Sequence, residues 1–514
     1  MSVSVSPVEQ VFSIRDLLAE ILLHSQKGHI ASYARVCKFW SDEALSTIWR
    51  AVNLHHLLLL LAPFNSQGTS FSRPISAADW SRFDKYAWRV YTLTCSRPSN
   101  FEPGIFDEIA LKRLRRDLLP NLTTLEIDHS LSPHILPLFS HASVQRLRFC
   151  DEAANSLLLG NPEKSAAILS YFPVVMPGLR TLSLTLSMKQ APGVSASSVG
   201  QLLASVLCDL HSLEEIILTS CLLTESVILS LLFLPRLRAI QTADFLSPYG
   251  PSICPLPPDN CFPQLETLHI ADSQAAVWLS QSQFPPNLLN LEIHTMANFE
   301  RSFSPEEQYK MMQRVARQCQ RLRTFSLTFS ALSNSSLKTL QPITFLAKLE
   351  TLRLVCLDTL EMEQDDLVTL LQALPYLRIL KIFMGLPTSK SALHLSVLSS
   401  LSPVAPRLEI LGLPFEIPLG IIPMDVSPFP KLRSLNLIMV GNEAPQVIEI
   451  ANFLSCVLPD QCTTEFEAWH QSSEWNKVGE LLSAIRGART QAAEPLTVPC
   501  FDMSHGTPRR VGSL

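Results

Sequence analysis

A six-residue phrase, Leu-x-x-Leu-x-Leu, recurs along this 514-residue chain and constrains its fold more than any other feature. With Ile, Val or Phe at some of the Leu positions, its copies start at Leu122, Val144, Leu179, Leu213, Leu237, Leu265, Leu288, Leu322, Leu349, Leu377, Leu408 and Leu432. Side chains alternate between the two faces of a strand, so Leu125 and Ile127 point to one face and Glu126 to the other. Each copy therefore predicts one short strand with an apolar face and a polar face.

The spacing of the copies leaves room for a helix after each strand. Successive copies start about 22 to 35 residues apart, and helix-like segments at 198–207, 304–315 and 365–374 lie between them. Abundant leucine alone would not keep the intervening positions polar. The pattern resembles leucine-rich repeats, and Cys221 stands at the turn position of one copy. The resemblance implies an α/β fold in which residues 120–445 form an irregular solenoid, or horseshoe, with parallel strands on its concave face.

Residues 12–50 are different in kind, because they predict three short amphipathic helices. About forty residues cannot bury all of this apolar surface alone, so we expect a partner. The run from Asp16 to Leu22, His29-Ile30, the run from Val36 to Trp40, and Ile48-Trp49-Arg50 together resemble the F-box motif. The resemblance implies these adaptor contacts or their supporting core: Leu17, Leu18, Ile21, Leu22, Ile30, Val36, Cys37 and Trp40.

F-box proteins bind the small adaptor of SCF-type cullin–RING ubiquitin ligases through this unit, and another domain holds the substrate. The resemblance therefore implies a substrate-recognition subunit whose partners are the adaptor, a cullin bound through it, and a protein substrate. Two alternatives stay open. The helices could be an end cap that seals the first repeat, since solenoids need end caps. The chain could then be a repeat scaffold for protein–protein interaction without ubiquitin transfer.

A substrate held by the repeats should meet the polar strand face. Alternation places one central side chain per strand there. The predicted substrate-binding residues are Glu126, Arg148, His269, Glu292, Arg353 and Lys381, in a row completed by Ser183, Ile217, Gln241, Ser326, Gly412 and Asn436. Arg353 and Lys381 would fall on neighbouring strands and repel each other unless an acidic partner meets them.

Composition narrows the remaining function classes. The net charge of −5 with 17% charged residues gives no reason to expect nucleic acid or a membrane as partner. Twelve cysteines include no C-x-x-C pair, so we expect reduced thiols and neither a metal site nor a cofactor. Phosphate-loop, dinucleotide, zinc-protease and serine-hydrolase motifs do not occur, which predicts no enzyme activity. The first ten residues lack a secretory pattern, and we expect a cytoplasmic or nuclear protein.

The other segments complete the predicted organisation. Residues 1–11 and 490–514 are expected to be a flexible N-terminus and a disordered tail, and 446–489 a helical cap. Residues 51–119 are expected to be a helical bridge, in which a helix over 76–90 carries an apolar stripe of Trp80, Phe83, Ala87 and Val90 that contains the aromatic residues Trp80 and Phe83. With Asp79 and Tyr86 on the same helix, the whole arrangement is similar to F-box proteins of mushroom-forming fungi.

Overall fold

The protein is described by a computed structural model that divides into two compact units. The first contains the described residues up to Leu360 and the second mainly those from Glu361 onward. The described residues are 14–95, 101–128, 132–158, 162–186, 196–243, 262–271, 284–295, 305–329, 335–356, 360–384, 393–416, 427–440, 447–468 and 473–493. The expected flexible segment 1–11 and nearly all of the tail 490–514 lie outside them.

The first unit opens with the three helices that the sequence predicts. These are α2 (Arg15–Leu23), α3 (Lys27–Tyr33) and α4 (Lys38–Arg50). Their core is small: Leu18, Leu22, Ile30 and Ala44 are buried together, and half-buried Trp40 packs against them. A core of this size leaves many apolar side chains of the same helices outside it.

Helix α4 joins this small unit to the rest of the chain. It runs directly into strand β1 (Ala51–Asn53), and its Trp49 stacks on Tyr86 of helix α6 (Ala77–Ala87) with 4.7 Å between ring centroids. The buried guanidinium of Arg89, just after α6, donates a hydrogen bond of 3.2 Å to the Asp42 carboxylate. Helix α6 confirms the helix predicted over 76–90 and its buried aromatic stripe.

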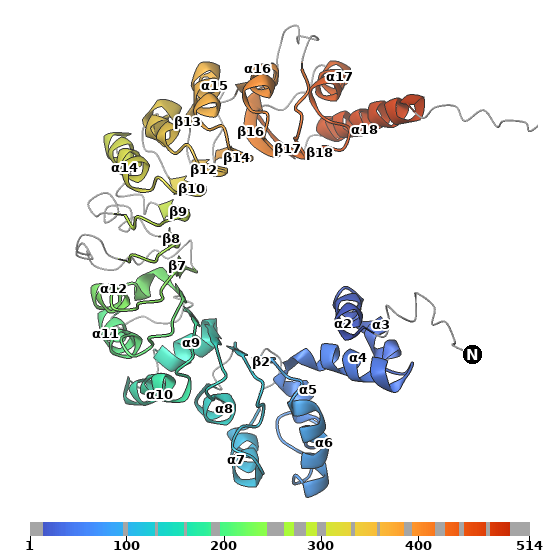
Figure 1. Ribbon diagram of the computed structural model, residues 1–514, viewed down its shortest axis with the longest axis vertical. Coiled ribbons are helices and arrows are strands. Elements are labelled where there is room, and N and C mark those ends of the chain that lie inside the picture. The colour runs from blue at the N-terminus through green and yellow to red at the C-terminus, as the bar shows by residue number, and fades with distance from the viewer. Residues whose placement is uncertain are drawn as a thin grey trace, which may run out of the picture. The chain divides into compact units, whose positions relative to one another are not determined.

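The strands of the first unit pair in parallel, in chain order, so each repeat adds one strand beside the previous one (Figure 1). They are β1, β2 (Thr92–Cys95), β3 (Thr124–Ile127), β4 (Arg146–Cys150), β5 (Thr181–Thr185), β6 (Glu215–Leu218), β7 (Ala239–Thr242), β8 (Thr267–Ala271), β9 (Asn290–Thr295), β10 (Thr324–Phe329) and β12 (Thr351–Cys356). The two-residue strands β11 (Ser335–Ser336) and β13 (Leu360–Glu361) stand outside this series.

The sheet begins two strands earlier than the repeat phrase predicts. Strands β1 and β2 lie within 51–119, which was expected to be a helical bridge, and Val52 pairs with Leu93 as Leu93 does with Leu125. Variant copies of the phrase occur there as Trp49-x-x-Val52-x-Leu54 and Val90-x-x-Leu93-x-Cys95, with Trp and Cys at two of the apolar positions. The segment is therefore part helix and part repeat.

The helices of the first unit follow the strands and cover one face of the sheet. Figure 1 shows α8, α11 and α12 on the same side of the strands. The helical segments after β1 are α5 (Leu54–Leu58), α6, α7 (Pro103–Lys112), α8 (Ser132–Phe139), α9 (Asp151–Leu158), α10 (Pro162–Val175), α11 (Ala196–Leu207), η2 (Ser220–Leu222), α12 (Glu225–Leu231), α14 (Pro305–Gln318) and η3 (Leu337–Phe345). Helices α11 and α14 confirm two of the predicted helices.

The second unit repeats the strand-and-helix pattern. Its strands β14 (Ile379–Met384), β15 (Leu393–His394), β16 (Ile410–Glu416), β17 (Ser434–Val440) and β18 (Thr463–Ala468) pair in parallel. Its helices are α15 (Gln364–Ala373), α16 (Val397–Val404), α17 (Val447–Val457) and α18 (Ser473–Ala493). Strand β18 lies within the segment expected to be a helical cap, and α18 covers it by stacking Trp475 on Phe466.

The apolar positions of the phrase form the core, as alternation predicts. Leu125, Ile127, Leu352 and Leu354 are all fully buried, whereas Glu126 between the first pair is half-buried. The fold is an α/β leucine-rich-repeat-like solenoid in each unit. Among the described helices, none combines the length and the apolar character that crossing a membrane would require.

Candidate interaction surfaces and a histidine–glutamate cluster

The structure separates two roles among the predicted adaptor contacts of the N-terminal helices. Leu18, Leu22 and Ile30 form the small core, and Trp40 packs edge-on against Tyr33 beside it, with ring centroids 5.7 Å apart. These four residues support the unit. The other four predicted contacts are exposed on its surface: Leu17, Ile21, Val36 and Cys37.

Exposed apolar side chains of these helices make up what we call the N-terminal apolar surface. It consists of the predicted contacts Leu17, Ile21 and Val36 together with Ile14, Leu23, Phe39 and Ile48, which were not predicted as contacts. The exposed fractions of Leu17, Ile21 and Val36 are 43%, 41% and 63%. Leu17 and Ile21 are four residues apart and therefore lie on one face of α2, and Ile14 directly precedes that helix as its N-cap residue. This surface could bind an apolar partner.

An ion pair holds helix α2 in place against α4. The guanidinium of Arg15 contacts the carboxylate of Glu43, and Glu43 is buried. A buried carboxylate requires a charged or hydrogen-bonding partner, which Arg15 provides. The orientation of α2, and with it the exposure of Leu17 and Ile21, is therefore fixed by a polar contact as well as by the core.

The polar strand face has the order that alternation predicts. In the first unit Glu126 pairs with Arg148, Arg148 with Ser183, and Ser326 with both Glu292 and Arg353. In the second unit Gly412 pairs with Lys381 and Asn436. Arg148 and Arg353 are exposed there, whereas Ser183, Ser326 and Asn436 are buried between their neighbours. We call this set of side chains the strand-face row.

Arg353 and Lys381, predicted as neighbours, belong to different units. Their mutual repulsion stays a prediction. Lys381 lies with its ammonium 6.0 Å from the centroid of the Phe383 ring on its own strand.

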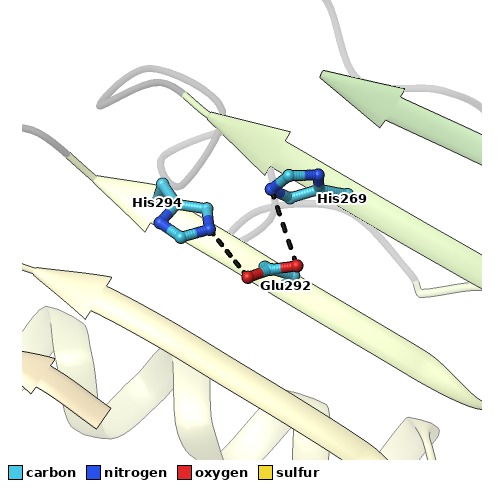
Figure 2. A group of neighbouring side chains, drawn as sticks. All are labelled: His269, Glu292 and His294. Atoms are coloured by element: carbon cyan, nitrogen blue, oxygen red, sulfur yellow. Dashed lines mark hydrogen bonds and ion pairs between the residues drawn. The ribbon is translucent and has the colours of Figure 1, made fainter. Parts of the chain in front are cut away.

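On strands β8 and β9, two side chains of the strand-face row, His269 and Glu292, lie close to a third side chain, His294. His269 pairs with Glu292 across the two strands, and His294 lies two residues beyond Glu292 on the same face of β9 (Figure 2). Nε2 of His294 is 2.9 Å from one carboxylate oxygen of Glu292, and Nε2 of His269 is 3.7 Å from the other. The two imidazole rings lie 5.1 Å apart. One carboxylate is thus held between two imidazoles.

The surroundings shift the pKa values of this cluster in defined directions. The hydrogen bond from His294 is the main cause that lowers the pKa of Glu292 to about 2, and Ser326 on β10 contributes a further hydrogen bond. His269 is only 8% exposed, and burial lowers its pKa more than the nearby Glu292 carboxylate raises it. At neutral pH, therefore, Glu292 is charged and the imidazole of His269 is neutral. The contact between them is polar and is not an ion pair.

Sequence reasoning found two members of this cluster and missed the third. His269 and Glu292 were predicted as substrate-binding residues of the row. His294 was missed because only the central side chain of each strand was considered, although residues i and i+2 of a strand share a face. That alternation, applied once more along β9, would have found it.

The described cysteines are all free. Burial raises the pKa of Cys319 to about 12 and that of Cys462 to about 11, which keeps both protonated at neutral pH. A protonated thiol is a poor nucleophile and a poor metal ligand. Among the described cysteines, Cys37 is the one that is exposed.

The sequence matches no protein-family model and has no match among curated proteins. Among solved structures, the chain is similar to one described as the crystal structure of the TLR13–ssRNA13 complex, with 15% sequence identity and a TM-score of 0.34. The alignment covers 68% of this chain and 44% of that chain, so this chain spans less than half the length of that structure. The solenoid described above rests on its own strands and registers.

Proposed function

We propose that this chain is a substrate-recognition subunit of an SCF-type cullin–RING ubiquitin ligase. The N-terminal apolar surface would bind the adaptor, and the strand-face row would bind a protein substrate. The observation that carries the proposal is a three-helix unit that exposes Leu17, Ile21 and Val36 while α4 anchors it to the repeats. These residues come from the segment that resembles the F-box motif.

Energetics support a partner for this surface. Fully burying a large apolar side chain is worth about 1.5–3 kcal/mol, and the unit leaves several such side chains partly in water. They lie outside its core of Leu18, Leu22, Ile30 and Ala44. A second protein that covered the surface would recover this free energy, because the hydrophobic effect scales with the apolar area removed from water.

The proposed mechanism needs no catalytic group in this chain. A substrate held on the strand-face row would be brought close to a ubiquitin donor carried by the ligase, which raises its effective concentration. The exposed Arg148 and Arg353 make an acidic segment a suitable substrate feature, since opposite charges favour encounter. In this proposal the chain is not itself an enzyme.

A pulldown of purified adaptor by the full chain tests the proposal. The test variant is Leu17→Asp with Ile21→Asp, because both side chains are exposed and outside the core. Leu111→Asp is the matched control, since Leu111 is an 86% exposed leucine on α7. We expect the wild type and the control to bind adaptor and the double variant to lose binding. Equal capture of adaptor by all three, or none by the folded wild type, would rule the proposal out.

A repeat scaffold without ubiquitin transfer is the second candidate. The observation that favours it is the attachment of α4 to β1 and α6, through Trp49, Asp42 and Arg89, since an end cap would also be attached in this way. A cap gains nothing from the exposed Leu17 and Ile21. If the double variant keeps its stability and no adaptor binds the wild type, the scaffold takes first place.

A further inference from the structure

We propose that His269, Glu292 and His294 form a binding site for a divalent transition-metal ion, with Zn²⁺ as the best-matched ion. The three residues offer two imidazole nitrogens and a carboxylate oxygen, and these donor atoms all lie within 4.8 Å of one another. Zn²⁺ is commonly held by histidine and carboxylate ligands, and imidazole also suits copper, iron and nickel. The inference is independent of adaptor binding, because it concerns other residues.

The strand geometry explains why the donors converge. Neighbouring strands lie about 4.8 Å apart, and residues i and i+2 of one strand lie about 6.6–6.8 Å apart on the same face. His269 and Glu292 face each other on neighbouring strands, and Glu292 and His294 are residues i and i+2 of strand β9. Side chains rooted on such a triangle can tilt toward a common centre, as Figure 2 shows for the two rings on either side of the carboxylate.

The distances fit a tetrahedral ion. Bonds of about 2.0–2.2 Å to Zn²⁺ separate neighbouring donor atoms by about 3.3–3.6 Å. The separations of 2.9 Å and 3.7 Å from Glu292 oxygens to the two histidine nitrogens lie on either side of that range. The two distances involve different oxygens of the carboxylate, so the carboxylate and the imidazole rings would rotate to bring all three groups onto one ion.

The surroundings also suit metal ligation. His269 and His294 are mostly buried and Glu292 is partly buried, which limits competition from water. Ser326 hydrogen-bonds Glu292 from the next strand and would orient it, as outer-shell partners do at metal sites. Three protein ligands leave one position of a tetrahedral ion for water or for a donor from a bound molecule. That position would lie on the strand face.

Zinc titration of the full chain tests the site. The protein would carry Cys37→Ser, which removes the one exposed thiol among the described cysteines, and be stripped with a chelator before titration by calorimetry. The test variants are Glu292→Gln, which keeps the shape of the side chain, and His294→Ala. His211→Ala is the matched control, because His211 is an exposed histidine in the turn before β6. Thermal unfolding of each variant without metal shows whether it is folded.

We expect one Zn²⁺ per chain in the wild type and in the His211→Ala control. Loss of a ligand should weaken binding at least about tenfold in both test variants, since even outer-shell changes cost that much. Zn²⁺ should also raise the unfolding temperature of the wild type more than that of Glu292→Gln at the same Zn²⁺ concentration. Equal Zn²⁺ affinity in Glu292→Gln and the control would overturn the proposal. If His294→Ala does not fold, the comparison of Glu292→Gln with the control is sufficient for the test.

Cobalt substitution identifies the ligands directly. Co²⁺ in a tetrahedral site of nitrogen and oxygen donors gives visible absorption without a thiolate charge-transfer band. We expect such a spectrum for the wild type and its loss in Glu292→Gln. A thiolate band that both proteins share would place the ion on cysteine and overturn the proposal.

Discussion

The three N-terminal helices and the repeat strands bury their apolar residues to very different degrees. In the repeats, Leu352 and Leu354 are fully buried, because their strand β12 pairs with β10 and helices cover this face of the sheet. In the N-terminal unit, Leu18 and Leu22 are buried while Leu17 and Ile21 on the same helix are exposed. Stacking supplies every repeat with neighbours, whereas a unit of three short helices has only itself and its anchor. The repeat helices also expose apolar side chains such as Leu111, so the contrast lies between the buried phrase positions of the strands and helix α2, which buries Leu18 and exposes its neighbour Leu17.

The largest expected effect tests the repeat side of the comparison. Leu352→Ala should destabilise its unit by about 2–5 kcal/mol, because the fully buried side chain would leave a cavity between sheet and helices. Denaturant unfolding followed by circular dichroism measures the change. Arg353→Ala, one residue on and exposed, serves as control and should stay within about 0.5 kcal/mol. A loss for Leu352→Ala no larger than that of the control would mean that the strand register is wrong.

A smaller loss of stability is expected for a substitution at the junction between the N-terminal helices and the repeats. Arg89→Met removes the hydrogen bonds of a buried guanidinium to Asp42 and Ser46 on α4. Since Asp42 is itself largely exposed, we expect a loss of only about 1 kcal/mol. Hydrogen exchange should speed up in α4 and leave β10 and β12 unchanged. Uniform acceleration across the repeats would show that the N-terminal helices and the repeats unfold as one cooperative body.

The stability contributed by Asp79, near the start of α6, should depend on pH. Hydrogen bonds from Arg73, and then from Ser76, lower the pKa of the Asp79 carboxyl well below its usual range. A carboxyl with a lowered folded-state pKa adds stability that is complete above its unfolded pKa near 3.8 and is lost as the pH falls toward its folded pKa. Asp79→Asn should therefore lower the melting temperature at neutral pH.

The difference between the two proteins should shrink as the pH falls below about 4. Melting curves of wild type and Asp79→Asn from pH 7 to pH 3 measure it. A difference that persists unchanged at pH 3 would show that the charge of Asp79 contributes nothing, and that only the shape of its side chain matters.

The smallest expected effect on stability belongs to the exposed side chains. Leu17→Asp with Ile21→Asp should change the free energy of unfolding by no more than about 0.5 kcal/mol for each substitution, since neither side chain is part of the core. Leu18→Asp, at a buried neighbour, is the contrasting variant and should unfold the helices. Urea titration compares them. A loss for the exposed pair as large as that for Leu18→Asp would remove the distinction between surface and core.

The repeat phrase by itself determined the strands, their order along the face and the buried side of each. Glu126, Arg148 and Ser183 are cross-strand neighbours as alternation predicts, because the period of two is a local property of extended backbone. Strands β1 and β2 were missed only because their copies of the phrase carry Trp49 and Cys95, respectively, at apolar positions where the phrase has Leu, Ile, Val or Phe. Their signal is also local.

Tertiary structure alone decided which apolar residues of the N-terminal helices are core and which are surface. Leu17 and Leu18 are adjacent and chemically identical, and only the positions of α3 and α4 bury one and expose the other. The same holds for His269, Glu292 and His294, whose meeting depends on the register between β8 and β9. A sequence fixes the alternation within each element, but burial and convergence depend on neighbours that the chain brings together only by folding.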